Sequence, residues 1–380
     1  MLNRRHLRVR AMQALYSYQQ AKGANYELGL DLIAENFLPD LNSMEVQDKK
    51  KLEGSKKLAQ TFYTEKVRDI KPDEDEEIPF EIKKVVDKAF DLYTKRNKKD
   101  HEWYNEDSLV AAEQVYKIYL LILQFFIDLS DKAEKEEKTS NIQSRLHQNK
   151  IIVSLKQNQR LKSLLIRFGV NWDNEQSLIS RIYKEAIKNN THYLEYCKIT
   201  NRTAEDDLGI LKYLLKNVIF KHELPLEFFD RYDLYFVDDM DVLRTMVTHS
   251  LQAYLTGQEV KIEELDDIWN ESKQFLKTLF NKTIENDKEL ESLLTSNLKN
   301  WELDRIAQTD SILLKMGLIE LMNFPSIPVK VTINEIIDIA KDYSTNQSGK
   351  FINGILDKLS KELVENGKIV KSGRGVLDNK

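Results

Sequence analysis

Residues 331–363 read VTINEIIDIAKDYSTNQSGKFINGILDKLSKEL, a pattern that predicts two amphipathic helices joined by a short polar turn. Thr332 and Glu335 have the spacing of a capping box, in which a hydroxyl and a carboxylate satisfy free N–H groups at a helix start. The apolar residues on both sides of the turn recur at i, i+3, i+4 and i+7, which indicates one buried stripe on each helix. These residues are Ile333, Ile336, Ile337 and Ala340, then Ile352, Ile355, Leu356, Leu359 and Leu363.

Phe351 and Asn353 lie off the second stripe, directly after the turn. They are therefore candidates for binding, since the core does not require them at these positions. The alternative is that Phe351 packs on a neighbouring helix and Asn353 only caps a helix end. Physical reasoning on this stretch alone leaves both interpretations open.

The composition of the chain predicts an all-α fold. The 380 residues include only 12 glycines and 6 prolines, so long segments run without a residue that breaks a helix. Hydrophobic residues make up 41% and charged residues 31%, which favours a packed core under a soluble surface. The scarcity of glycine also weighs against nucleotide-binding folds, whose phosphate loops need clustered glycines.

Cysteine content and hydropathy predict a cytoplasmic protein without a membrane anchor. Cys197 is the only cysteine in the sequence, so it has no partner for an internal disulfide, which suits a reducing compartment. The most apolar segment, residues 109–129, is interrupted by polar residues and is expected to be a buried helix. The alternative for the arginine-rich start is an organellar transit peptide, but the start lacks serine enrichment.

The first helix is predicted over residues 3–22, with Gly23 ending it. Helical periodicity of about 100° per residue places Arg5, Met12 and Tyr16 on one flank of its apolar face. Arg8 lies between that flank and the core edge, and Gln13 lies further round. Arg4, Arg5, Arg8 and Arg10 precede the first acidic residue of the chain. Such a strip suits an RNA strand, because guanidinium groups bind phosphates and an aromatic ring stacks on a base. The alternative is a solvated basic edge.

The sequence divides into four predicted parts. Residues 1–24 form an N-terminal helix, and residues 268–365 form a C-terminal helical core. Residues 25–267 are expected to be a helical extension, with a mobile acidic loop at about 69–80 that contains Asp73–Glu77. Residues 366–380 are basic and contain glycine, so a disordered tail is predicted.

Catalytic, metal and cofactor motifs are missing from the sequence. The six histidines lie far apart and no His-Glu-x-x-His occurs. The run Asp238–Asp241 lacks the DDxxD spacing of a magnesium-dependent prenyl-transfer site, and a helix N-terminus explains its charge. No Gly-x-Ser-x-Gly elbow occurs either. We therefore expect a binding protein that is not an enzyme and has no cofactor.

Three blocks of this sequence resemble the transcription antitermination protein NusB family, in a longer form. The first is the arginine-rich start, Arg4 to Tyr16. The second runs from Phe275 through Trp301 to Leu313. The third contains Ile333-Asn334-Glu335 and, further on, Lys350-Phe351-Ile352-Asn353-Gly354. Together the blocks cover roughly a third of the chain, and the third block is the most specific.

The resemblance implies an all-α, NusB-like double helical bundle that carries a large helical insertion. Members of the family bind the boxA element of ribosomal RNA transcripts, together with a small-subunit ribosomal protein in its NusE role, in an antitermination complex with RNA polymerase. Matching the motifs position by position implies an RNA-binding surface of Arg4, Arg5, Arg8, Gln13, Tyr16, Lys350, Phe351 and Asn353. These residue types suit single-stranded RNA.

The sequence departs from the family's pattern in the large extension and at two surface positions. Ser311 stands where the family has a basic residue, and Gln347 where an acidic residue is common. Two alternatives therefore stay open. One is a helical protein–protein scaffold without RNA binding. The other is a NusB-like RNA-binding domain associated with ribosomal RNA modification, although no methyl-donor loop is found.

Overall fold

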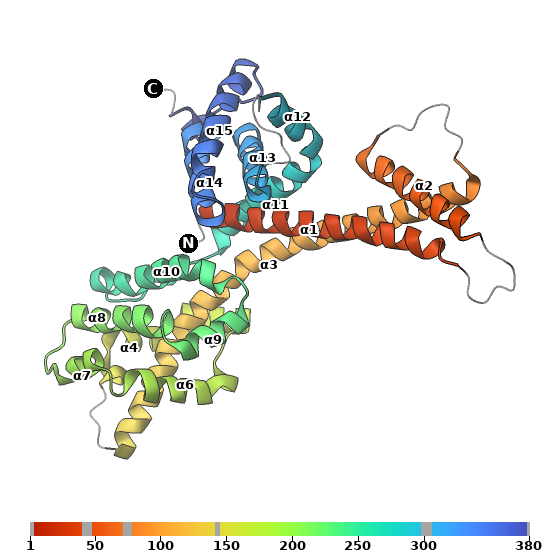
Figure 1. Cartoon of the computed structure of the whole chain (residues 1–380). Helices are drawn as coiled ribbons and strands as arrows, with labels where there is room; N and C mark the ends of the chain where they lie inside the picture. The colour runs from red at the N-terminus through yellow and green to blue at the C-terminus, as the bar shows by residue number, and fades with distance from the viewer. Residues whose placement is uncertain (1–3, 40–47, 71–77, 141–144, 298–305, 378–380) are drawn as a thin grey trace. The chain divides into compact units, whose positions relative to one another are not determined.

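The computed structural model describes residues 4–39, 48–70, 78–140, 145–297 and 306–377, and every regular element within them is helical (Figure 1). The acidic run Asp73–Glu77 lies outside the described residues. The helices are α1 (Arg4–Asn36), α2 (Lys49–Arg68), α3 (Phe80–Ser140), α4 (Lys150–Gln157), α5 (Gln159–Phe168), α6 (Gln176–Ile182), α7 (Thr191–Lys198), α8 (Ala204–Leu214), α9 (Glu223–Tyr232), α10 (Phe236–Gly257), α11 (Asp266–Glu285), α12 (Asp287–Asn297), α13 (Gln308–Asn323), α14 (Val329–Tyr343) and α15 (Ser348–Glu365). The all-α prediction is confirmed.

The chain forms two compact units. Residues 1–7 and 109–274 form one, the middle unit, and residues 8–108 and 275–380 form the other, the flanking unit. This division differs from the predicted extension of residues 25–267. Its first part, up to residue 108, belongs to the same unit as the C-terminal helices.

The middle unit is built around the second part of α3. Residues there such as Tyr119, Leu120 and Phe126 are completely buried. By length and composition, α3 is the one described helix that could cross a membrane, but 61% of its most apolar window is buried inside the protein. That burial is what a core helix requires. The indole of Trp172 donates to the Leu121 carbonyl at 2.9 Å and packs against the same helix.

The flanking unit contains a three-helix bundle of α13, α14 and α15, which lie side by side (Figure 1). The predicted pair of amphipathic helices is confirmed as α14 and α15. Gly317 on α13 makes this close packing possible, because a Cβ atom there would lie 3.0 Å from a methyl of Leu356. The bundle therefore holds the start of α15 in a fixed place.

A second cluster in the flanking unit joins α1, α2 and the first part of α3. We call it the Tyr63 cluster; its buried members are Ile33, Ala59, Phe62, Tyr63, Ile82, Val86, Ala89 and Tyr93. The ring of Tyr63 stacks on Tyr26 at 5.4 Å. This cluster corrects the prediction that the first helix ends at Gly23. α1 continues to Asn36 because its second half buries Ile33 against α2 and α3.

The predicted capping box at Thr332 and Glu335 is wrong. α14 begins at Val329, after an extended Pro328, so both residues lie inside the helix. The Thr332 hydroxyl donates instead to Glu320 at 2.7 Å, and Glu335 accepts from Arg8 at 3.3 Å. The spacing of three residues places both side chains on one helix face, where they meet other helices.

The tail is ordered up to residue 377, which corrects the predicted disorder over that part. Ile369 is buried, and residues Gly373–Val376 form a short 3-10 turn. The Lys371 ammonium donates to the carbonyls of Leu321 and Phe324 at 2.9 and 3.1 Å. Because the last carbonyls of a helix lack partners within it, the tail lysine serves as a cap for α13.

Candidate functional site

The turn between α14 and α15 is fixed by one buried carboxylate. Asp310, in the first turn of α13, accepts from the hydroxyl of Ser344 at 2.6 Å and from that of Ser348 at 2.7 Å. Asp310 is 6% exposed and Ser348 is 2% exposed. The Ser348 hydroxyl also lies 2.7 Å from that of Thr345. Three segments of the bundle therefore meet at Asp310, which fixes where α15 begins.

Lys350 and Asn353 lie exposed on the first turns of α15, and Phe351 between them is half-buried. A spacing of three residues places the ammonium and the amide on the same side of the helix. Within the part of the chain that the structure describes, the side chains of Lys350 and Asn353 make no hydrogen bond and no ion pair. A cation and an amide are thus presented together on a rigid support.

Arg8 lies in the core of the flanking unit and not on its surface. Its guanidinium donates to both carboxylate oxygens of Glu320, at 2.6 and 2.7 Å, and both side chains are buried. Glu335 lies 3.3 Å away, and the ring of Phe275 covers the guanidinium at 5.6 Å. A bidentate pair of this kind fixes the geometry strongly. Arg8 therefore positions α1 against α13 and α14.

The remaining predicted residues of α1 in the flanking unit differ in exposure. Gln13 is half-buried and accepts from Arg10 at 2.7 Å. Met12 is buried, whereas Tyr16 is 40% exposed. The Tyr16 hydroxyl makes no hydrogen bond among the described residues. Tyr16 therefore presents an open aromatic face, while Gln13 is already engaged in part.

Arg4 and Arg5 belong to the middle unit. Arg4 donates to Glu271 at 2.8 Å, and both side chains of this pair are exposed. Arg5 is half-buried. The structure thus brings Lys350, Phe351 and Asn353 together on α15, and Gln13 and Tyr16 together on α1. Arg4 and Arg5 lie in the middle unit.

Sequence reasoning missed the acidic residues that support this site. Asp310 and Glu320 both lie on α13, whose residues 312–321 are all buried and mostly apolar. A charged residue inside an apolar helix is the signal that could have identified them, because a buried charge needs a partner. Lys315 on the same helix follows this rule, with Asp287 at 2.5 Å.

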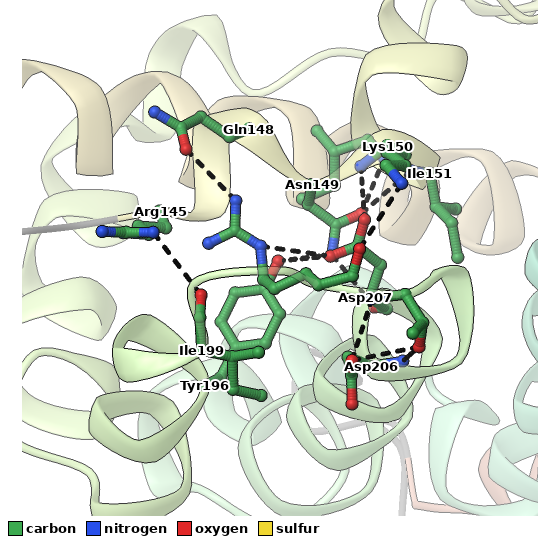
Figure 2. Close-up of polar contacts among 12 residues, drawn as sticks. Arg145, Gln148, Asn149, Lys150, Ile151, Tyr196, Ile199, Asp206 and Asp207 are labelled. Atoms are coloured by element: carbon green, nitrogen blue, oxygen red, sulfur yellow. Dashed lines mark hydrogen bonds and ion pairs between the residues drawn. The ribbon is translucent and has the colours of Figure 1, made fainter.

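The middle unit contains a separate buried polar network centred on Asp207 (Figure 2). Asp207 accepts from the Tyr196 hydroxyl and from the backbone N–H of Lys150, both at 2.7 Å. Asn149 donates to the Asp207 carbonyl at 3.0 Å. Burial, with the Asp207 carboxylate second, raises the pKa of Tyr196. The network provides acceptors for the free N–H groups at the start of α4 and joins α4 to α7 and α8. Its role is therefore to stabilise the fold.

The described residues contain no group of three or more His, Cys, Asp or Glu side chains that could hold a metal ion. The polar groups of the candidate site are a lysine, an amide and a tyrosine. Such groups can bind phosphates and bases, but they form no set of metal ligands.

Comparison with known proteins finds similarity over part of the chain. The NusB family model matches residues 240–361. A "Transcription antitermination protein NusB" from Chloroherpeton thalassium is 33% identical over 150 residues, 37% of this chain and 71% of the relative. One of the same name from Salinibacter ruber is 39% identical over 28% of this chain and 66% of the relative. One from Exiguobacterium sp. is 39% identical over 24% of this chain and 72% of the relative.

Among solved structures, T. maritima NusB is similar at 29% sequence identity. That similarity covers 41% of this chain and 92% of the other chain, with a TM-score of 0.25. Most of the middle unit lies outside the family match, since the match begins at residue 240 and the unit takes in residues 109–274.

Proposed function

The chain belongs to the NusB family, and we propose on that premise that it binds boxA-like single-stranded RNA of ribosomal RNA transcripts as an antitermination factor. The observation that carries the proposal is the start of α15. There Lys350 and Asn353 are exposed beside a turn that Asp310 holds in place. Binding on such a support costs little conformational entropy, because the groups are already in position.

The proposed surface uses three kinds of contact. Lys350 binds a phosphate, Asn353 forms hydrogen bonds to a base edge, and Tyr16 stacks on a base. Phe351 and Gln13 contribute the parts of their side chains that remain exposed. Arg4 and Arg5 belong to the middle unit and are proposed as phosphate contacts of that unit alone. Arg8 is left out of this surface, because Glu320 and Glu335 already occupy its guanidinium.

The partners we propose are a small-subunit ribosomal protein in the NusE role and the RNA polymerase antitermination complex, in the cytoplasm. The three relatives reported above are all named transcription antitermination protein NusB. This chain covers 66 to 72% of the length of each. The proposed role is binding without catalysis. Its groups are a cation, an amide and a ring, and it needs no cofactor.

A titration with boxA-like RNA at two salt concentrations tests the proposal. Lys350→Glu should weaken binding about tenfold and lower the salt dependence by about 0.7 in the log–log slope, as one lost phosphate contact predicts. Tyr16→Ala should weaken binding without changing that slope, because it removes stacking only.

Lys282→Glu is the matched control, since it makes the same charge change at an exposed position of α11. It should leave the affinity close to that of the wild type. If Lys350→Glu and Tyr16→Ala bind RNA as tightly as the wild type, the proposed surface is wrong. A chain that captures the ribosomal protein but shows no RNA binding would favour the scaffold function instead.

A further inference from the structure

One flank of α3 carries a row of four cations outside the family match. Lys88, Lys95, Arg96, Lys99 and Trp103 all lie on the part of α3 that belongs to the flanking unit, and all are exposed. At about 100° per residue, these five side chains fall within an arc of about 100° on the helix surface. Between Lys88 and Trp103 the only other residue in this arc is Leu92, so no acid interrupts it. We call this surface the α3 flank.

The four cations of the α3 flank make no ion pair among the described residues. Nearby lysines behave differently. Lys66 pairs with Asp87 at 2.5 Å, and Lys277 pairs with Glu106 at 3.0 Å. Like charges four residues apart on a helix repel, as Lys95 and Lys99 do, and cost a few tenths of a kcal/mol. Among the described residues, the α3 flank therefore carries four cations without an ion-pair partner, and the exposed acids Asp91 and Glu102 lie just outside its arc.

Trp103 adds an aromatic surface to these cations. Its side chain is 54% exposed, and its ring meets that of Tyr104 edge-on at 4.7 Å. The two rings meet at 82°, and Trp103 keeps about half of its surface exposed beside this contact. A single exposed aromatic residue is ordinary on protein surfaces. An exposed indole one helical turn from Lys99 and two turns from Arg96 has the composition of a single-strand binding surface, in which bases stack and cations track phosphates.

We propose that the α3 flank is a second RNA-binding surface, which grips single-stranded RNA without sequence preference. This inference rests on the proposed function, because the RNA bound at the α3 flank is the stretch of the strand next to the boxA-like element. The row is about 22 Å long from Lys88 to Trp103 at 1.5 Å per residue. Each of the four cations along that length can meet a phosphate of a single RNA strand.

A membrane surface fits the α3 flank less well. Helices that lie on membranes insert a broad apolar face among the lipid chains. The α3 flank has only Trp103 and the half-buried Leu92 as apolar residues. The opposite face of this part of α3 is already used, since Val86, Ala89 and Tyr93 are buried in the Tyr63 cluster.

The test uses the full chain and a twelve-nucleotide oligo(U) RNA, which has no boxA sequence. Lys95→Glu/Lys99→Glu should weaken oligo(U) binding at least tenfold at low salt. It should also lower the log–log salt slope by about 1.4, which is two phosphate contacts at about 0.7 each. Trp103→Ala should weaken binding about tenfold and Trp103→Phe much less, because phenylalanine still stacks. Quenching of tryptophan emission by oligo(U) should be smaller in Trp103→Phe.

The matched control is Lys162→Glu/Lys261→Glu, which makes the same charge change at two exposed positions of the middle unit. It should bind oligo(U) like the wild type. Unchanged oligo(U) affinity in Lys95→Glu/Lys99→Glu would overturn the proposal. So would binding to phosphatidylserine vesicles that depends on these lysines while oligo(U) binding does not.

The two proposals can fail independently. If Lys350→Glu leaves boxA affinity intact while Lys95→Glu/Lys99→Glu abolishes oligo(U) binding, the surface at α15 is wrong and the α3 flank stands. The reverse result removes the α3 flank alone. All substituted residues are exposed, so thermal melting should show that each variant keeps the stability of the wild type within a few degrees.

Discussion

Arg8 and Glu320 lie 312 residues apart in the sequence and form a buried bidentate ion pair, with distances of 2.6 and 2.7 Å. Glu320 also accepts from the Thr332 hydroxyl at 2.7 Å, so its carboxylate joins three helices of the flanking unit. Because both side chains are removed from water, removing either one would leave the other as a buried charge without compensation. This pair fixes α1 beside the bundle that carries Lys350.

Replacing Arg8 with Met should destabilise the flanking unit by about 3–5 kcal/mol, because Glu320 is left as a buried charge without its partner. Arg8→Lys should also be destabilising, since an ammonium cannot form the bidentate pair. The double variant Arg8→Met/Glu320→Leu should recover much of the loss. Hydrogen exchange of the α13–α15 amides measures these changes locally.

The control for Arg8 is Lys341→Met, which breaks the exposed pair between Lys341 and Asp338. Exposed pairs contribute little, so exchange rates should change by less than the equivalent of about 0.5 kcal/mol. If Arg8→Met protects these amides as well as the wild type does, the buried pair does not support the bundle.

The sequence could predict the helices but not the partners of Arg8. Helical periodicity correctly indicated α14, α15 and the apolar face of α1, because periodicity is a local property of the chain. Helical periodicity also placed Arg8 at the edge of the core. Whether that guanidinium meets a phosphate or a carboxylate depends on Glu320, which is far away in sequence. The arginine strip was therefore interpreted as one surface, although the structure buries two of its members, Arg8 and Arg10.

Local rules also failed where tertiary contacts override them. Gly23 carries a cost inside a helix, yet α1 continues past it because Ile33 and Tyr26 pack on α2 and α3. Thr332 and Glu335 match a capping pattern but pair with Glu320 and Arg8. In both places the energy of long-range packing exceeds a local preference of about 1 kcal/mol.

Gly29 on α1 lies so close to α2 that an alanine does not fit. A Cβ atom there would lie 2.1 Å from the hydroxyl oxygen and 2.4 Å from Cζ of Tyr63, whose ring is completely buried. Gly29→Ala should therefore destabilise the Tyr63 cluster by about 1–3 kcal/mol, as overpacking does. Hydrogen exchange of α2 measures the loss.

Gly23→Ala is the matched control on the same helix. A Cβ atom at Gly23 would meet nothing within 4 Å. This variant should stabilise the protein by up to about 1 kcal/mol, because alanine favours the helix. Equal effects of the two substitutions would contradict the close approach of α1 and α2.

Tyr18 makes stability depend on pH in the alkaline range. Burial raises the pKa of Tyr18 to about 12, and the charges of Tyr93, Asp100 and Asp287 add to the shift. Below about pH 10 the phenol is protonated in both the folded and the unfolded chain, so its contribution is fully present. Between about pH 10 and 12 the unfolded chain loses the proton first. Stability therefore falls as pH rises through this window.

Tyr18→Phe should lose less stability than the wild type between about pH 9 and 11.5, because phenylalanine cannot ionise. Thermal melting at the two pH values measures the difference. A residual loss is expected in the variant, since burial also raises the pKa of Tyr63. An equal loss in both proteins would show that Tyr18 does not titrate with a raised pKa.

Asp310 should control RNA binding without touching RNA. It is buried and accepts from Ser344 and Ser348, so it holds the turn before Lys350. Asp310→Ala leaves these hydroxyls without their charged acceptor. We expect a stability loss of about 1.5–3 kcal/mol, which is the range for hydrogen bonds to charged groups. Faster hydrogen exchange at residues 345–351 should accompany it.

The same variant should weaken boxA-like RNA binding at least fivefold, at a temperature where the protein remains folded. Lys350 then samples several positions, and ordering it again costs free energy on binding. Asp310→Asn keeps one acceptor oxygen and should lie between the wild type and Asp310→Ala. Asp357→Ala is the control, because Asp357 is exposed on α15 and pairs only with Lys361 among the described residues. If Asp310→Ala and Asp357→Ala bind RNA equally well, the rigid turn is not what places Lys350 for the phosphate.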